Sequence, residues 1–321
     1  MGDYQYLFGP VPSRRFGRSL GVDLTPYKTC SLDCVFCQLG RTKKKTVHRR
    51  EYVPTDSVLV ELGEWLKKWD GQADYITLSG SGEPTLHSGF GKVLEFIRSK
   101  TTIPAVLLTN GTMLQLREVR EAAACANVVK VSLSAWDQAS YGWVNRPHEQ
   151  LQFDQLVKGL KDFRAHFKGQ LWVEVFLVAG MNSMPADVSK IAGHAREICP
   201  DRIQLNTAVR PPAEDFATAL SEDRMQSLRH LFHPTAQIIA EFKAQHADHI
   251  KANQATIFAM LQRRPCTAQQ IADIFGMHLN EVSKYLGKLM HTDLIRAQRE
   301  RATVYYAATD RKDTVAARNT V

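Results

Sequence analysis

The chain has 321 residues, of which 44% are hydrophobic, enough for one large core and a smaller second one. Its formal net charge of +8 is concentrated at the two ends, an asymmetry that suits an anionic partner. No run of about 18 apolar residues and no apolar N-terminal segment is present, which argues against a membrane span and a secretory signal and predicts a cytoplasmic protein.

Apolar, β-branched runs alternate with amphipathic helical patterns in residues 1–232. The candidate strands are 19–24, 74–79, 104–109, 128–134, 171–178 and 202–206. The candidate helices are 56–69, 89–99, 113–125, 151–167, 185–198 and 221–232. This alternation predicts an α/β fold with a parallel sheet and right-handed crossovers. Because there are six units and a closed barrel has eight, we expect an open, partial (β/α)6 barrel, with a doubly wound sheet as the alternative.

The last part of the chain has a different pattern. Residues 233–252 have helical periodicity after a proline and predict a helical connector. Residues 253–309 predict a small second domain, in which three short helices precede an alternating segment that indicates a hairpin. This order matches a winged helix-turn-helix, as found in many transcription factors. Residues 310–321 predict a disordered tail.

Three cysteines share one short loop after the first candidate strand. Residues 30–37 read CSLDCVFC, so Cys30, Cys34 and Cys37 follow a C-x3-C-x2-C spacing with no fourth cysteine nearby. Closed zinc and iron–sulfur sites take four protein ligands, whereas three ligands leave one metal position open to a cofactor or substrate. A zinc site completed by His48, or unrelated structural thiols, are the alternatives.

Each of the other candidate strands also runs into a polar or glycine-rich turn. The turn after the second strand reads SGSGEP and the turn after the third reads TNGT. In a barrel, functional groups gather at the C-terminal ends of the strands, so we expect these turns to lie beside the cysteine loop.

The cysteine loop with Phe36 before its last cysteine, followed one βα unit later by SGSGEP, resembles the radical S-adenosylmethionine (SAM) superfamily. The resemblance implies a [4Fe–4S] cluster held by Cys30, Cys34 and Cys37, with SAM on the open iron. One electron then breaks the sulfonium C–S bond, and the 5′-deoxyadenosyl radical abstracts a hydrogen atom from a substrate. The superfamily also implies a low-potential flavodoxin or ferredoxin as electron donor.

The same resemblance implies a set of residues around SAM. They are Phe36, Gly80, Ser81, Gly82, Glu83, Asn110, Ser132, Ser134, Glu174, Asn182 and Gln204. The segment with Glu83 would face the amino group of SAM, Glu174 the ribose or the methionine end, and Asn182 the adenine. A cap on the next helix is the alternative role for Glu83, and turn formation is the alternative for the serines and asparagines.

A longer stretch, FGPVPSRRFGRSLGVDLTPYKTCSLDCVFCQLGRT, is similar to a bacterial and archaeal group of radical SAM proteins, as are NRPH at 145–148 and QLNTAVRPP at 204–212. That group is related to the enzymes that build the wyosine base of tRNA. The resemblance implies the chemistry but not the substrate. Together with the basic residues and the winged helix, it makes a nucleic acid, a tRNA base, the first hypothesis for the substrate. A protein or small metabolite docked through the winged helix is the first alternative, and an iron–sulfur, redox-sensing DNA-binding regulator is the second.

Basic residues flank the first candidate strand in two groups, which are Arg14, Arg15 and Arg18 before it and Arg41, Lys43, Lys44, Lys45, Arg49 and Arg50 after the cysteines. We expect both groups near the mouth of the barrel, where a phosphate-rich RNA or DNA would meet them. The residues singled out for substrate contact are Arg14, Arg15, Arg146 and Arg210.

Overall fold

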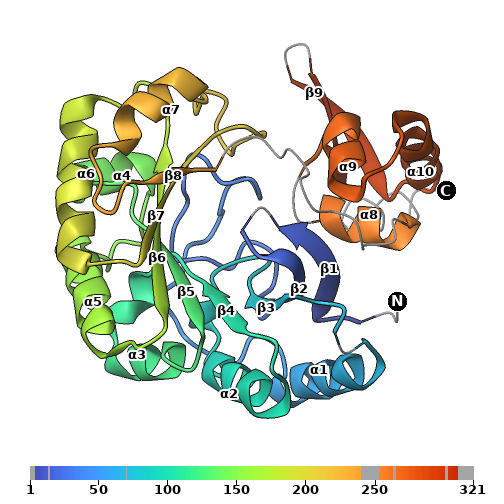
Figure 1. Cartoon of the computed structure of the whole chain (residues 1–321), viewed down its shortest axis with the longest axis horizontal. Helices are drawn as coiled ribbons and strands as arrows, with labels where there is room; N and C mark the ends of the chain where they lie inside the picture. Colours follow the sequence, from blue (N-terminus) through green and yellow to red (C-terminus); the bar gives the residue numbers. More distant parts are fainter. Residues whose placement is uncertain are drawn as a thin grey trace.

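The computed structural model describes residues 4–13, 15–69, 71–239, 253–262, 265–300 and 303–309. Within these residues, a large sheet with helices around it is followed by a small unit of three helices and a hairpin (Figure 1). None of the described helices is long and apolar enough to cross a membrane.

Eight strands form one sheet in sequential order. They are β1 (Leu7–Ser13), β2 (Gly17–Val22), β3 (Tyr75–Leu78), β4 (Ala105–Leu108), β5 (Val128–Ser132), β6 (Gln170–Leu177), β7 (Arg202–Thr207) and β8 (Gln237–Ile238). Strands β2 to β8 are parallel, and β1 is antiparallel to β2. A sequential order excludes the doubly wound alternative, in which the order reverses. Since β1 and β8 do not pair within the described residues, the sheet is open.

The six predicted strands are present as β2 to β7. The sequence pattern does not predict β1, because this strand contains Gly9, Pro10 and Pro12, which are rare inside strands and tolerated at a sheet edge. It does not predict β8 either, which is only two residues long. Residues 233–239, expected to begin a helical connector, contain this strand instead, and residues 240–252 lie outside the described part of the chain.

Helices cover the outer face of the sheet (Figure 1). They are α1 (Thr55–Trp69), α2 (Phe90–Lys100), α3 (Arg117–Ala123), α4 (Gln138–Val144), α5 (Phe153–His166), α6 (Pro185–Ile198) and α7 (Glu222–Arg229), with two 3-10 turns, η1 (Pro84–Leu86) and η2 (Thr112–Gln115). In α1, buried Val58, Leu62 and Trp65 are spaced as one face of a helix and pack into the main core. Helix α4 is not predicted from the sequence.

The small unit contains α8 (Gln254–Leu261), α9 (Ala268–Phe275) and α10 (Leu279–His291), then β9 (Ile295–Glu300) antiparallel to β10 (Thr303–Ala308). It has a core of its own, which includes Ile257, Ile271 and Leu286. Val11 of β1 packs against this core, so the unit lies beside the edge of the large sheet (Figure 1). The expected three helices and hairpin are present, and the predicted tail at 310–321 lies outside the described residues.

Candidate functional site

The cysteine loop follows β2 at the edge where the parallel strands end. The turn after β3 lies against it, because the backbone N–H of Glu83 donates to the carbonyl of Thr29 at 2.9 Å and that of Lys28 donates to the carbonyl of Ser81 at 2.6 Å. Gly82 permits this approach, since a Cβ there would lie 2.0 Å from the Thr29 carbonyl oxygen. The expected meeting of these two segments is therefore present.

Each cysteine sulfur in the loop has one side-chain N–H donor. The N–Sγ distances are 3.1 Å for Lys28 and Cys37, 3.3 Å for Asn145 and Cys34, and 3.6 Å for Asn110 and Cys30. Burial raises the pKa of Cys30 to about 12 and also raises the pKa of Cys34. These thiols therefore hold their protons unless a metal replaces them, which is how a metal centre couples to proton release.

The three thiols suit a multi-iron cluster better than a single ion. Among the described residues, no three His, Cys, Asp or Glu side chains are placed to hold one metal ion. A zinc ion needs all its ligands converging at about 2.0–2.3 Å, whereas in an iron–sulfur cluster each iron takes its own cysteine. His48, the alternative fourth zinc ligand, is exposed to solvent.

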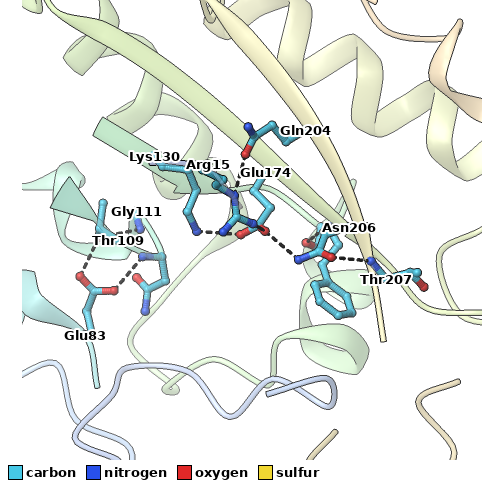
Figure 2. Close-up of polar contacts among 12 residues, drawn as sticks. Arg15, Glu83, Thr109, Gly111, Lys130, Glu174, Gln204, Asn206 and Thr207 are labelled. Carbon is cyan, nitrogen blue, oxygen red and sulfur yellow. Dashed lines mark hydrogen bonds and ion pairs between the residues drawn. The ribbon is translucent and has the colours of Figure 1, made fainter. Parts of the chain in front are cut away.

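Glu83 connects the ends of β3 and β4 (Figure 2). Its Oε1 accepts from the backbone and hydroxyl of Thr85, at 3.0 and 2.6 Å, and from the hydroxyl of Thr109 at 2.6 Å. Its Oε2 accepts from the backbone of Asn110 at 2.7 Å. Glu83 thus caps η1, as the alternative role predicts. Since Oε1 has three donors and Oε2 one, Oε2 has room for one more, and contact with SAM stays a prediction.

A charged cluster lies inside the barrel around Glu174 of β6 (Figure 2). Glu174 forms ion pairs with Arg15 and, at 2.7 Å, with Lys130, and it accepts from Asn206 at 2.9 Å. Arg15 also donates to Gln204 at 2.8 Å. Burial alone would raise the pKa of Glu174, but the positive charges of Arg15 and Lys130 outweigh it and hold this pKa well below its usual range.

The charged cluster around Glu174 brings together three residues that the sequence singled out. Glu174 and Gln204 were expected to contact SAM, and Arg15 the substrate. Sequence reasoning missed Lys130, although a lysine in the buried run VVKVS of β5 is the signal that could have found it. Two cations and one carboxylate leave this part of the barrel interior with a net charge of +1.

Asn182 braces the ends of β5 and β6. Its side chain accepts from the backbone of Val178 at 2.7 Å and donates to the carbonyls of Ser134 and Phe176, both at 2.8 Å. The hydroxyl of Ser134 accepts from the backbone of Phe176 at 3.0 Å. Both side chains are buried and form hydrogen bonds within the protein. A contact between adenine and the turn at Asn182 stays a prediction, and it would involve the backbone of that turn.

Three more of the predicted cofactor residues lie at strand ends or in the cysteine loop. Phe36 stacks on Phe176 with ring centroids 4.0 Å apart, which fixes the end of the cysteine loop over β6. Ser132 is the last residue of β5. Gly80 has φ +147°, and a side chain there would collide with Asp23, which also accepts from the Ser81 hydroxyl at 2.6 Å. No described contact tests the roles of these residues toward SAM.

The basic residues are not all at the mouth of the barrel. Arg14 lies outside the described residues, Arg15 points into the interior, and Arg210 is buried. Arg146 shares the carboxylate of Glu214 with Arg41. The expectation for Arg18 is wrong, because β1 and β2 form a hairpin whose turn puts Arg18 at the N-terminal edge of β2, where it pairs with Asp74 at 2.8 Å.

The amino-acid sequence matches a family model and several known proteins. The model described as the radical SAM superfamily matches residues 24–192. A Brachyspira hyodysenteriae protein named GTPase Obg is 35% identical over 94% of this chain and 45% of its own length. A UPF0026 protein of Methanocaldococcus jannaschii is 35% identical over 65% of each chain. The chain thus spans less than half of the first relative and just under two thirds of the second.

Among solved structures, a radical SAM methyltransferase from Sphaerobacter thermophilus superposes with a TM-score of 0.52. The match covers 68% of this chain and 65% of that one, at 14% sequence identity. At this identity the likeness shows the fold alone.

Proposed function

Since the chain belongs to the radical SAM superfamily, we propose that Cys30, Cys34 and Cys37 hold its cluster and that its substrate is a nucleic acid, a base of tRNA. The chain is a radical SAM enzyme, and the cofactors of this superfamily are a [4Fe–4S] cluster and SAM. When bound, the cluster supplies the electron that splits SAM into methionine and a 5′-deoxyadenosyl radical, which takes a hydrogen atom from the substrate.

The donor set at the strand ends supports this assignment of residues. Three thiols come from one loop, each beside an N–H donor, as a cluster with anionic sulfur ligands requires. We assign the turn with Glu83 to the amino group of SAM and Glu174, which is held ionised, to its ribose or methionine end. Glu174 accepts two donors on Oε1 and one on Oε2, so one acceptor position is left for a SAM hydroxyl or amine.

The observation that carries the substrate proposal is the group of exposed lysines and arginines that directly follows the cysteine loop. Arg41, Lys43, Lys44 and Arg50 are all exposed on the stretch that leaves the cluster ligands. Cationic side chains around an active site attract the phosphates of a nucleic acid and position its bases. A substrate with many phosphates therefore fits this edge of the barrel.

The C-terminal unit supports the same substrate. We propose that residues 253–309 form a winged helix domain, because three helices and a hairpin follow in the order that such domains have. Among the described residues of this unit, the exposed lysines and arginines are Lys284 and Lys288 of α10 and Arg296 and Arg299 of β9. None of the four forms an ion pair within the described residues, so their charge is open to phosphates.

Binding of unmodified tRNA to the reconstituted protein tests the substrate proposal. We expect binding that weakens steeply with salt, because phosphate contacts release counterions. The double variant Lys43→Glu, Lys44→Glu should weaken binding and lower the salt slope by roughly one for each lost contact. The matched control is Lys67→Glu, Lys68→Glu, two exposed lysines in the last turn of α1 at the other edge of the barrel. Equal binding by both double variants would remove the support for this substrate.

A protein substrate is the second candidate, favoured by exposed apolar side chains on the C-terminal unit. Leu279, Met290, Leu294 and Val304 are all exposed there, and apolar surface of this kind serves protein docking. The regulator alternative loses its support, since the chain is a radical SAM enzyme. For either substrate, we propose a flavodoxin or ferredoxin as the electron donor.

A further inference from the structure

Helix α4 places two polar side chains toward the cysteine loop. The helix begins at an Asp137 cap, whose carboxylate accepts from the backbone of Ser140 at 2.7 Å while the Ser140 hydroxyl accepts from the backbone of Asp137. Tyr141 and Asn145 are four residues apart, and the backbone N–H of Asn145 donates to the Tyr141 carbonyl at 3.0 Å. Residues with this spacing lie on one face of a helix, one above the other.

The end of α4 is tied to the cysteine loop through the backbone. The N–H of Val35 donates to the carbonyl of Val144, and the N–H of Asp33 donates to the carbonyl of Asn145, both at 3.0 Å. The N–H of His148 donates to the Ser31 carbonyl at 2.9 Å. The NRPH segment therefore holds the loop in register with α4, which brings the buried Asn145 amide to 3.3 Å from the Cys34 sulfur.

The hydroxyl of Tyr141 is buried and has no hydrogen-bond partner among the described residues. The side chain is 1% exposed and packs in the main core, against which Cys30 and Cys34 also pack. Cys34 and Cys30 lie near enough to act electrostatically on this phenol, and its O–H group can donate to an anion there. A buried hydroxyl without a partner costs free energy, so a missing acceptor is expected beside it.

We propose that Tyr141 and Asn145 donate hydrogen bonds to sulfur atoms of the bound cluster and make the cluster easier to reduce, with Lys28 as a third donor. Reduction adds negative charge, and hydrogen bonds or positive charge at the sulfurs stabilise the reduced form. This inference rests on the proposed function, because it needs the cluster at the three cysteines. It gives the NRPH segment and α4 a role as positioning elements that tune the cluster.

The test is the midpoint potential of the reconstituted cluster, measured by EPR-monitored redox titration without SAM. Tyr141→Phe keeps the ring and removes only the hydroxyl, so we expect full iron and sulfide content and a more negative potential. Asn145→Leu should shift the potential in the same direction. Lys28→Met should shift it further, because a full positive charge is lost with the donor. Tyr75→Phe, at the opposite end of β3, is the control and should leave the potential unchanged.

A second measurement uses the cluster-free protein. Removing an unpaired hydroxyl should leave Tyr141→Phe as stable to heat as the wild type, or more stable. A lower melting temperature would mean that the hydroxyl already has a partner in the protein, which would overturn the inference. An unchanged midpoint potential of the cluster in Tyr141→Phe would overturn this inference but leave the proposed function standing. A wild-type protein that takes up no cluster would overturn the proposed function and the inference with it.

Discussion

The barrel interior contains ionised side chains at positions where apolar side chains would be buried without a desolvation cost. Glu174 is almost fully buried, and buried ions are tolerated only when partners replace the lost water. Here Arg15 and Lys130 supply the opposite charge, and Asn206 completes the donors to the carboxylate. An ion pair of this kind adds little net stability over apolar packing, so stability alone does not explain this charged cluster, and contact of Glu174 with SAM stays a prediction.

Replacing Glu174 tests the electrostatic account at the scale of one residue. Glu174→Gln leaves Arg15 and Lys130 buried without a counter-charge, so we expect a loss of about 3–5 kcal/mol in the free energy of unfolding at neutral pH. Denaturant unfolding of the cluster-free protein measures it. The matched control is Glu121→Gln, because Glu121 pairs with Arg117 on the surface and the change should be small.

The same variant has a pH signature. Because the pKa of Glu174 is lowered in the folded protein, its stabilising effect is complete above the ordinary glutamate pKa of about 4.3 and is lost as the pH falls below it. The difference in the free energy of unfolding between wild type and Glu174→Gln should therefore be constant from about pH 6 to 8 and should shrink in acid. A difference that grows as the pH falls would contradict the assigned charge state.

The sequence shows which residues are unusual but not which of them meet. Arg15, Glu174 and Gln204 stand out individually as polar residues in or before buried strands, yet their contact depends on how three strands are aligned. Ser132 is the register partner of Glu174, and Lys130 reaches the carboxylate from two residues earlier in β5. Such register is set by the packed sheet, so the β5 run can single out Lys130 as unusual but cannot show that it meets Glu174.

At the scale of elements, the contact between the cysteine loop and the turn after β3 depends on one glycine. A methyl group at Gly82 would overlap the Thr29 carbonyl, which is backbone and cannot move without shifting the loop. We expect Gly82→Ala to lower the iron bound per chain after reconstitution and to lower the melting temperature. Iron and sulfide analysis with thermal unfolding measures both effects.

Gly142 provides the matched control for that substitution. It lies on the exposed face of α4, near the cysteine loop, and a Cβ there meets nothing within 4 Å. Gly142→Ala should keep full iron content and raise stability by up to about 1 kcal/mol, since alanine favours a helix. If Gly82→Ala binds as much iron as Gly142→Ala, the close approach of the two loops does not matter for the cluster.

Long periodic elements follow directly from the sequence, and short ones do not. The apolar runs of β2 to β7 and the amphipathic periods of the other helices from α1 to α7, without α4, are readable because burial on one or both faces fixes their composition. Helix α4 has seven residues, including Gly142, and is held by its Asp137 cap and by the cysteine loop. Its existence depends on tertiary contacts, so the Tyr141–Asn145 pair is not foreseen.

At the scale of the whole molecule, the C-terminal and N-terminal ends of the parallel strands carry different groups of residues. The cysteine loop, the turn with Glu83 and the end of α4 meet at the C-terminal edge, and the Arg18–Asp74 pair lies at the other. Arg15, in the turn between β1 and β2, extends into the interior, where it meets Glu174 (Figure 2). The C-terminal unit attaches beside β1, away from the strands that carry Glu174 and Gln204 (Figure 1).

Formation of 5′-deoxyadenosine tests the central claim that these three cysteines hold the catalytic cluster. The protein is reconstituted anaerobically with iron and sulfide, then given dithionite, SAM and tRNA. Wild type and Cys125→Ala should form the product, because Cys125 lies beside Glu95 beyond the end of α3. Cys34→Ala should bind little iron and should form no 5′-deoxyadenosine. Product from Cys34→Ala at the wild-type level, or its loss in Cys125→Ala, would contradict the account.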